Sequence, residues 1–186
     1  MIKKLLMGIL ILIVLFSIFL YQNYQKSPTS KDVYKITEGW TPSIDEVLDL
    51  KKVDGEWLTF FINEHTLFVG KLEQNWMGSW ILMDDEGEKG SVIATANYPP
   101  ESDNEGVTWG ATGINDKTSY YFGMISNPNV EEIVIVAQGN EYKDIPFIHS
   151  KGNRFFLLRT KGNIIPYSFT ALSKDGEIIA PKPPQK

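Results

Sequence analysis

The chain has 186 residues, 18 basic and 23 acidic side chains, and no cysteine. Without thiols, the sequence excludes disulfides, iron–sulfur clusters, cysteine zinc sites and a cysteine nucleophile. After Ser30, 15 basic residues stand against all 23 acidic ones, a net charge of −8. Nucleic-acid binding needs Lys and Arg against phosphates, so this charge excludes a nucleic-acid partner from the expected function.

An apolar run from Leu5 to Leu20 follows Lys3 and Lys4 at the N-terminus. A bilayer-spanning helix needs about 20 apolar residues, with a lower limit of about 17, whereas a secretory signal has an apolar region of about 7 to 15. The run lies between these limits, and Tyr21 and Tyr24 extend it with aromatic residues of the kind found at membrane interfaces. We therefore expect residues 1–25 to form a single-pass anchor.

The residues after the apolar run decide between an anchor and a cleaved signal peptide. Tyr21 to Ser30 is bulky and polar and lacks the small-residue pattern of a signal peptidase site. The absence of cysteine also excludes a lipid-modified cysteine. We favour an uncleaved signal-anchor over a cleaved peptide. The positive N-terminal flank predicts a cytoplasmic N-terminus and an extracytoplasmic remainder in the cell membrane.

A polar segment and a short amphipathic pattern come next. Residues 26–38 are expected to be a linker. Ser43 is a plausible N-cap, and Ile44, Val47 and Leu48 have the i, i+3, i+4 spacing of one helical face. This predicts a short helix that begins at Ser43 and ends near Lys52.

After Gly55, short runs rich in β-branched and aromatic residues alternate with Gly, Asn, Asp and Pro. The predicted strands are Glu56–Ile62, Thr66–Glu73, Ser79–Asp84, Ser91–Asn97, Val107–Ile114, Thr118–Ile125, Glu132–Gln138, Lys143–His149, Arg154–Thr160, Ile165–Leu172 and Glu177–Ala180. They predict a mainly β domain over residues 39–180, an antiparallel β-sandwich or barrel-like fold preceded by one short helix. Residues 181–186 are expected to be a disordered tail.

Three stretches carry a resemblance to a known family: Tyr121–Ile135 with its Asn-Pro turn, Arg154–Leu158, and Thr170–Ile179 with its Asp-Gly turn. The chain resembles a group of small membrane-anchored proteins of bacillus-type Gram-positive bacteria that have no assigned activity. The resemblance covers roughly Trp57 to Ile179 and is best after Tyr120. It implies a membrane-anchored, extracytoplasmic β domain, and its motifs are turns and strands rather than catalytic residues. The strand after the Asn-Pro turn reads as buried on both faces.

Two alternatives concern a hydrolase and a calcium site. A hydrolase would need His65 or His149 beside a serine and a carboxylate, but neither a Gly-x-Ser-x-Gly nor a His-Glu-x-x-His motif is present. Two acidic stretches, Asp84–Glu88 and Glu101–Gly106, could offer oxygen ligands to calcium, yet neither has EF-hand spacing. We therefore predict no catalytic, cofactor-binding or metal-binding residues, and keep a small cell-envelope hydrolase and a calcium-dependent binding domain as alternatives.

Aromatic residues supply the candidate binding surface. Most are expected to fill the sandwich core, and an exposed strip would suit a glycan or a peptide. The candidate surface is Trp76, Trp80 and Trp109, with Trp76 at the tip of the hairpin Gln74–Gly78. We expect a membrane-tethered binding or interaction module, not an enzyme, whose partner is an envelope protein or glycan.

Overall fold

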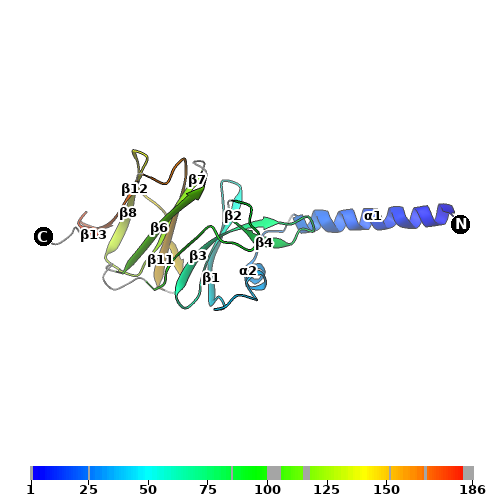
Figure 1. Ribbon diagram of the computed structural model, residues 1–186, viewed down its shortest axis with the longest axis horizontal. Coiled ribbons are helices and arrows are strands. Elements are labelled where there is room, and N and C mark those ends of the chain that lie inside the picture. The colour runs from blue at the N-terminus through cyan, green and yellow to red at the C-terminus, as the bar shows by residue number, and fades with distance from the viewer. Residues whose placement is uncertain are drawn as a thin grey trace.

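A computed structural model describes residues 2–24, 26–84, 86–99, 106–114, 118–150, 152–165 and 167–181. The helix α1 (Ile2–Tyr24) extends away from a β-rich domain (Figure 1). Its segment Leu6–Tyr24 has a mean hydropathy of 2.2, and none of it is buried against the domain. By length and composition, α1 can therefore cross a membrane.

The β domain consists of three antiparallel sheets, none of which closes into a barrel. Sheet A has the order β1 (Glu46–Val53), β2 (Glu56–Ile62), β3 (Thr66–Gln74) and β4 (Trp80–Met83), with β5 (Ala94–Asn97) also paired to β3. Sheet B has the order β10 (Ile148–Ser150), β11 (Asn153–Lys161), β7 (Thr118–Ile125) and β6 (Val107–Ile114). Sheet C has the order β13 (Ile178–Ala180), β12 (Tyr167–Ser173), β8 (Val130–Ala137) and β9 (Asn140–Tyr142).

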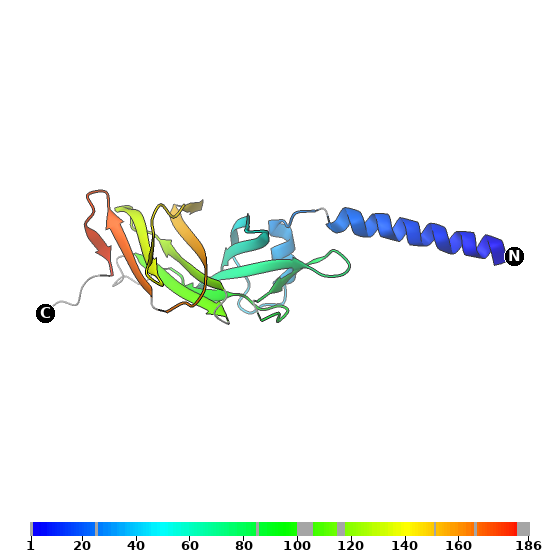
Figure 2. The same cartoon turned by 90° about the horizontal axis from the view of Figure 1, so that it is seen from above.

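The three sheets stack as layers, with sheet B in the middle. Alternate residues of a strand point to opposite faces. On β7, Tyr120 and Phe122 therefore pack against sheet A, whereas Tyr121 and Ile125 pack against sheet C. Figures 1 and 2 show that the layers follow one another along the long axis, with sheet A nearest α1 and sheet C farthest from it.

A second helix, α2 (Ser30–Ile36), covers part of the outer face of sheet A. Val33 is fully buried and packs in one cluster with Phe61 and Leu82 of the sheet. The helix begins at a capping arrangement, because the Asp32 carboxylate accepts hydrogen bonds from the backbone N–H of Thr29 at 2.8 Å and from its hydroxyl at 2.7 Å.

The mainly β, antiparallel fold with one short helix is confirmed, but the helix is not where the sequence placed it. The prediction of a helix from Ser43 to Lys52 is wrong, because Glu46–Val53 forms strand β1. The short helix instead lies at Ser30–Ile36, inside the predicted linker. Val47 and Leu48, which were expected to share one face of a helix, pack in different clusters on opposite faces of this strand.

Most predicted strands are confirmed with boundaries that differ by a few residues. The predicted strand Lys143–His149 is wrong for most of its length, since β9 ends at Tyr142 and β10 begins at Ile148. The strand after the Asn-Pro turn, β8, is buried on both faces at Ile133, Val134 and Ile135 but exposed at Glu131, whereas β7 in the middle layer is buried from Ser119 to Ile125. Residues 101–105, 115–117 and 182–186 lie outside the described residues, so the tail prediction remains a prediction.

Candidate functional site

The hairpin formed by β3 and β4 projects from sheet A toward α1. The pairing of β2 with β3 ends at Trp57 and Leu72, whereas β3 continues to Gln74, which pairs with Trp80 of β4. Figure 2 shows the hairpin reaching the C-terminal end of α1. The projection leaves a corner between the hairpin and the β1–β2 turn.

The hairpin and the end of α1 are joined by hydrogen bonds. The Tyr24 hydroxyl donates to the carbonyl oxygen of Asn75 at 2.8 Å, and the Gln74 side-chain amide donates to the carbonyl oxygen of Asn23 at 2.8 Å. Gly78 has a φ of +77°, and a Cβ atom there would lie 2.6 Å from the Cβ atom of Asn23. Glycine therefore permits both the turn and the close approach to the helix.

The corner holds a hollow of about 550 Å³, which we call the hairpin groove. It lies where residues 26 and 27, at the exit from α1, pass over sheet A. Its lining includes Lys26, Lys52, Trp57, Lys71, Glu73 and Trp80. A neighbouring hollow of about 740 Å³ between α2 and β4 shares Lys26, Ser27 and Trp80 with it. Both volumes lie within the range of roughly 300–1,000 Å³ that is usual for ligand sites.

Two tryptophans form an aromatic wall of the hairpin groove. The rings of Trp57 and Trp80 meet edge to face, with centroids 6.5 Å apart and an interplanar angle of 78°. The ammonium group of Lys52 lies 6.0 Å from the Trp57 ring centroid, a cation–π arrangement. The groove therefore combines apolar surface with a positive charge at its edge.

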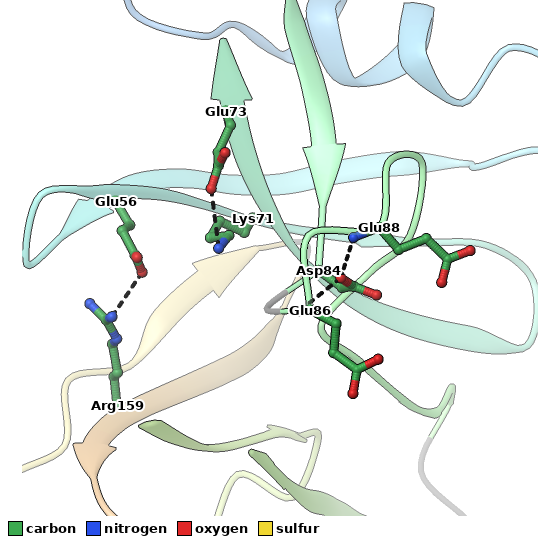
Figure 3. A network of polar contacts seen from close by, with 7 residues as sticks. All are labelled: Glu56, Lys71, Glu73, Asp84, Glu86, Glu88 and Arg159. Atoms are coloured by element: carbon green, nitrogen blue, oxygen red, sulfur yellow. Dashed lines mark hydrogen bonds and ion pairs between the residues drawn. The ribbon is translucent and has the colours of Figure 1, made fainter. Parts of the chain in front are cut away.

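The carboxylates at the groove are held in ion pairs with the domain (Figure 3). Glu73 pairs with Lys71 at 3.2 Å, and the Lys71 side chain is only 10% exposed. Glu56 pairs with Arg159 of β11 at 2.9 Å, which joins sheet A to sheet B. Because these acids are already neutralised, exposed Lys52 gives the groove a preference for anionic groups or hydrogen-bond acceptors.

Two of the three predicted site residues lie on the same hairpin, and one of them, Trp80, is among the residues that line the groove. Trp80 lines the groove, and Trp76 lies at the tip of the same hairpin with 70% of its surface exposed. Trp109 lies elsewhere, stacked on Phe169 with ring centroids 4.7 Å apart in the core between sheets B and C. Trp109 therefore packs against the core, as was expected of most aromatic residues, and lies away from the other two candidates.

The histidines lie far apart in the sequence and in different settings. His65 is exposed in the β2–β3 turn, with its Nε2 atom 3.8 Å from a Glu64 oxygen. His149 lines a hollow of about 420 Å³ together with Ser126 and Ser150. The Ser126 hydroxyl donates to the carbonyl oxygen of Gly106 at 3.0 Å, and none of the described residues lining this hollow is a carboxylate. A histidine and two serines thus share a hollow without the third member of a triad.

In the acidic stretch that begins at Asp84, a carboxylate oxygen of Asp84 stabilises the loop through backbone hydrogen bonds. Asp84 Oδ1 accepts hydrogen bonds from the backbone N–H groups of Glu86 at 2.9 Å and Glu88 at 2.7 Å. Figure 3 shows the side chains of Glu86 and Glu88 pointing in different directions. Within the described part of the chain, no three His, Asp or Glu side chains gather at metal-binding distance. The other acidic stretch, residues 101–105, lies outside that part.

Of the residues that line the hairpin groove, Trp80 was proposed from the sequence as a candidate, but Lys26, Lys52, Lys71 and Glu73 were not. These residues come from segments that only the folded sheet brings together, so no local motif marks them. Comparison with protein-family models, with curated proteins and with solved structures finds no match for the chain. The case for a function therefore rests on the geometry of the molecule itself.

Proposed function

We propose that this protein is a single-pass membrane protein with an uncleaved, N-in anchor, whose extracytoplasmic β domain binds a neighbouring protein of the cell envelope. A Gram-positive envelope is the setting that the sequence resemblance favours. The observation that carries the proposal is the position of the hairpin groove, which opens where the chain leaves α1. A ligand of that groove would itself be close to the membrane.

The chemistry of the groove favours a peptide segment that carries carboxylates. Trp57 and Trp80 offer the aromatic surface that dominates many binding hot spots. Lys52 offers a charge-assisted hydrogen bond to a carboxylate, while Glu73 and Glu56 are held by Lys71 and Arg159. An acidic, extended segment of a membrane-protein partner would fit both the aromatic surface and the positive charge of Lys52. The groove would bind this segment without reacting with it.

Site-specific photocrosslinking in intact cells tests this function. A photoreactive residue at Lys26, an exposed residue of the groove lining that leaves Lys52 intact, is expected to form an adduct with one membrane protein, identified by mass spectrometry, and Trp80→Ala should reduce that adduct strongly. The matched control is the same residue at Lys174, in the β12–β13 turn at the other end of the domain. Equal adducts from both positions, or a glycan as the captured partner, would overturn the proposal.

The orientation is tested separately by thiol labelling, because the chain has no native cysteine. Lys174→Cys should react with a membrane-impermeant maleimide in intact cells, whereas Lys3→Cys should react only after permeabilisation. The reverse pattern would place the domain in the cytoplasm.

One observation favours a second candidate, a small hydrolase centred on His149. That side chain shares its hollow with Ser126 and Ser150. If this hollow is catalytic, an activity-based probe for serine hydrolases should label the purified protein, and His149→Ala should abolish the labelling. Absence of labelling in the wild-type protein would leave binding as the function.

A further inference from the structure

We infer that the tip of the β3–β4 hairpin is a second membrane contact, at which Trp76 and Met77 insert into the interfacial layer of the bilayer that α1 crosses. The inference rests on the proposed membrane anchoring by α1. In addition to α1, the hairpin tip would then be a surface of the domain that contacts lipid.

The first support is the exposure of two large apolar side chains at one tip. Trp76 is 70% exposed and Met77 is 45% exposed. The β12–β13 turn at the far end of the domain carries Lys174 and Asp175 instead. Ile178 of β13 is also 59% exposed, so the contrast lies between the tips of the two hairpins and not between the whole ends of the domain.

The second support is the level of the tip along α1. Its residues bond to Asn23 and Tyr24, in the last turn of the helix. On the same helix end, Tyr21 is 67% exposed and Tyr24 is 47% exposed. Tyrosine and tryptophan concentrate where a membrane span meets water, so Trp76 lies at the depth at which such rings are most stable.

The third support is that the turn satisfies its own polar groups. The Asn75 side-chain oxygen accepts hydrogen bonds from the N–H groups of Met77 at 2.9 Å and Ser79 at 3.0 Å. The backbone N–H groups of Asn75 and Gly78 donate to the carbonyl oxygens of Ser79 and Asn75, at 2.9 and 2.8 Å. Entry into lipid is costly for unpaired backbone groups, and this turn leaves few of them to desolvate.

The charge of the tip indicates the kind of lipid surface. Residues 74–80, Gln-Asn-Trp-Met-Gly-Ser-Trp, carry no charged side chain. Insertion is therefore driven by apolar and aromatic contact, not by attraction to anionic headgroups, and should not depend on anionic lipid or on salt.

A depth measurement on the full-length protein in phosphatidylcholine vesicles tests the inference. Met77→Cys, labelled with a nitrobenzoxadiazole dye, should lose most of its fluorescence to a nitroxide carried on the lipid and resist an aqueous quencher. Trp76→Ser on this background should reverse both results. Lys174→Cys, in the turn at the far end, is the matched control and should show the reverse pattern from the start.

A label at Val14→Cys in α1 distinguishes membrane anchoring by α1 from insertion of the hairpin tip. If Val14 is lipid-exposed but Met77 responds like Lys174, the tip does not insert, although the anchoring stands. If Val14 responds like Lys174, the anchoring fails and the inference falls with it. Protection of Met77 in native membranes but not in pure lipid would assign the tip to a protein partner and overturn the lipid contact.

Discussion

At the scale of single residues, the middle layer has the least room. Gly123 of β7 lies where a Cβ atom would meet the carbonyl oxygen of Thr108 and would lie 2.6 Å from a ring carbon of Phe156. The first belongs to β6 and the second to β11, so a side chain at this position would push against both neighbouring strands. Glycine at this position therefore allows β6 and β11 to pair closely with β7 on either side.

Replacing Gly123 by alanine should therefore destabilise the domain. We expect Gly123→Ala to lower the free energy of unfolding by about 1–3 kcal/mol through overpacking. Urea denaturation in detergent, followed by tryptophan fluorescence, measures this change. Gly39→Ala is the control, since no atom lies within 4 Å of a Cβ there, and it should change stability by less than about 0.5 kcal/mol. Equal effects would contradict the packing argument.

Tyr121 gives a prediction for alkaline pH. Its hydroxyl donates to the carbonyl oxygen of Ile164 at 3.0 Å, and burial raises the pKa of Tyr121 above its ordinary value. The folded state therefore keeps the proton after the unfolded state has lost it. This stabilising contribution is complete below the unfolded pKa of about 10 and is lost as the pH rises through the folded pKa.

We expect Tyr121→Phe to cost about 1 kcal/mol at pH 7, because it leaves the carbonyl of Ile164 without its donor. Above pH 10 the variant should lose stability less steeply than the wild-type protein. Urea midpoints measured from pH 7 to pH 11 compare the two slopes. Parallel slopes would show that Tyr121 does not titrate differently in the two states.

At the scale of elements, β1 shows why part of the fold could not be predicted. Val47 and Leu50 both face the cluster beneath α2, although an odd separation places residues on opposite faces of a regular strand. The bulge between Val47 and Asp49 adds the extra residue that brings them to one face. The helix prediction instead rested on Ile44, Val47 and Leu48. Leu48 packs in the cluster on the opposite face of the sheet, so the apparent i, i+3, i+4 pattern combined residues of two faces.

Most other strands were predictable because they are rich in β-branched and aromatic residues and their turns contain Gly, Asn or Asp. The start of α2 could also have been found, since Thr29 and Asp32 have capping-box spacing. The hairpin groove could not, because the pairing of its segments depends on strand register. Of its two tryptophans, Trp80 was predicted as a site residue and Trp57 was not.

The cap of α2 can be tested on its own. Asp32→Ala removes the acceptor for both hydrogen bonds from Thr29 and should destabilise the helix by about 1 kcal/mol. Hydrogen exchange of the amides in α2 should accelerate about fivefold for that loss. Lys31→Ala, an exposed change in the same helix, should leave the exchange unchanged. Matching acceleration in both variants would argue against the cap.

At the scale of the whole molecule, an ion pair couples the layer nearest α1 to the middle layer. Arg159 of β11 lies 2.9 Å from Glu56 of β2, and its guanidinium is 5.8 Å from the Tyr120 ring centroid. The Arg159 side chain is 17% exposed, so the contact is shielded from water more than an ordinary surface pair. The ion pair between Arg159 and Glu56 therefore links sheet A to sheet B.

Arg159→Gln should lower the free energy of unfolding by about 1–3 kcal/mol, because it leaves the Glu56 carboxylate without its charged partner. Arg159→Lys keeps the charge and should recover part of the loss. Chemical denaturation in detergent compares the three proteins. Identical stabilities would mean that the pair contributes nothing to holding the layers together.

The stacking of the sheets gives the domain a fixed height. Packed sheets lie about 10 Å apart, so sheet C stands roughly 20 Å beyond sheet A. If α1 were the only attachment to the membrane, the domain could rotate about the end of this helix, and sheet C could take many positions relative to the membrane. If α1 and the hairpin tip both contact the membrane as proposed, these two attachments would fix the orientation of the domain, and a partner bound in the hairpin groove would always meet it from the same direction.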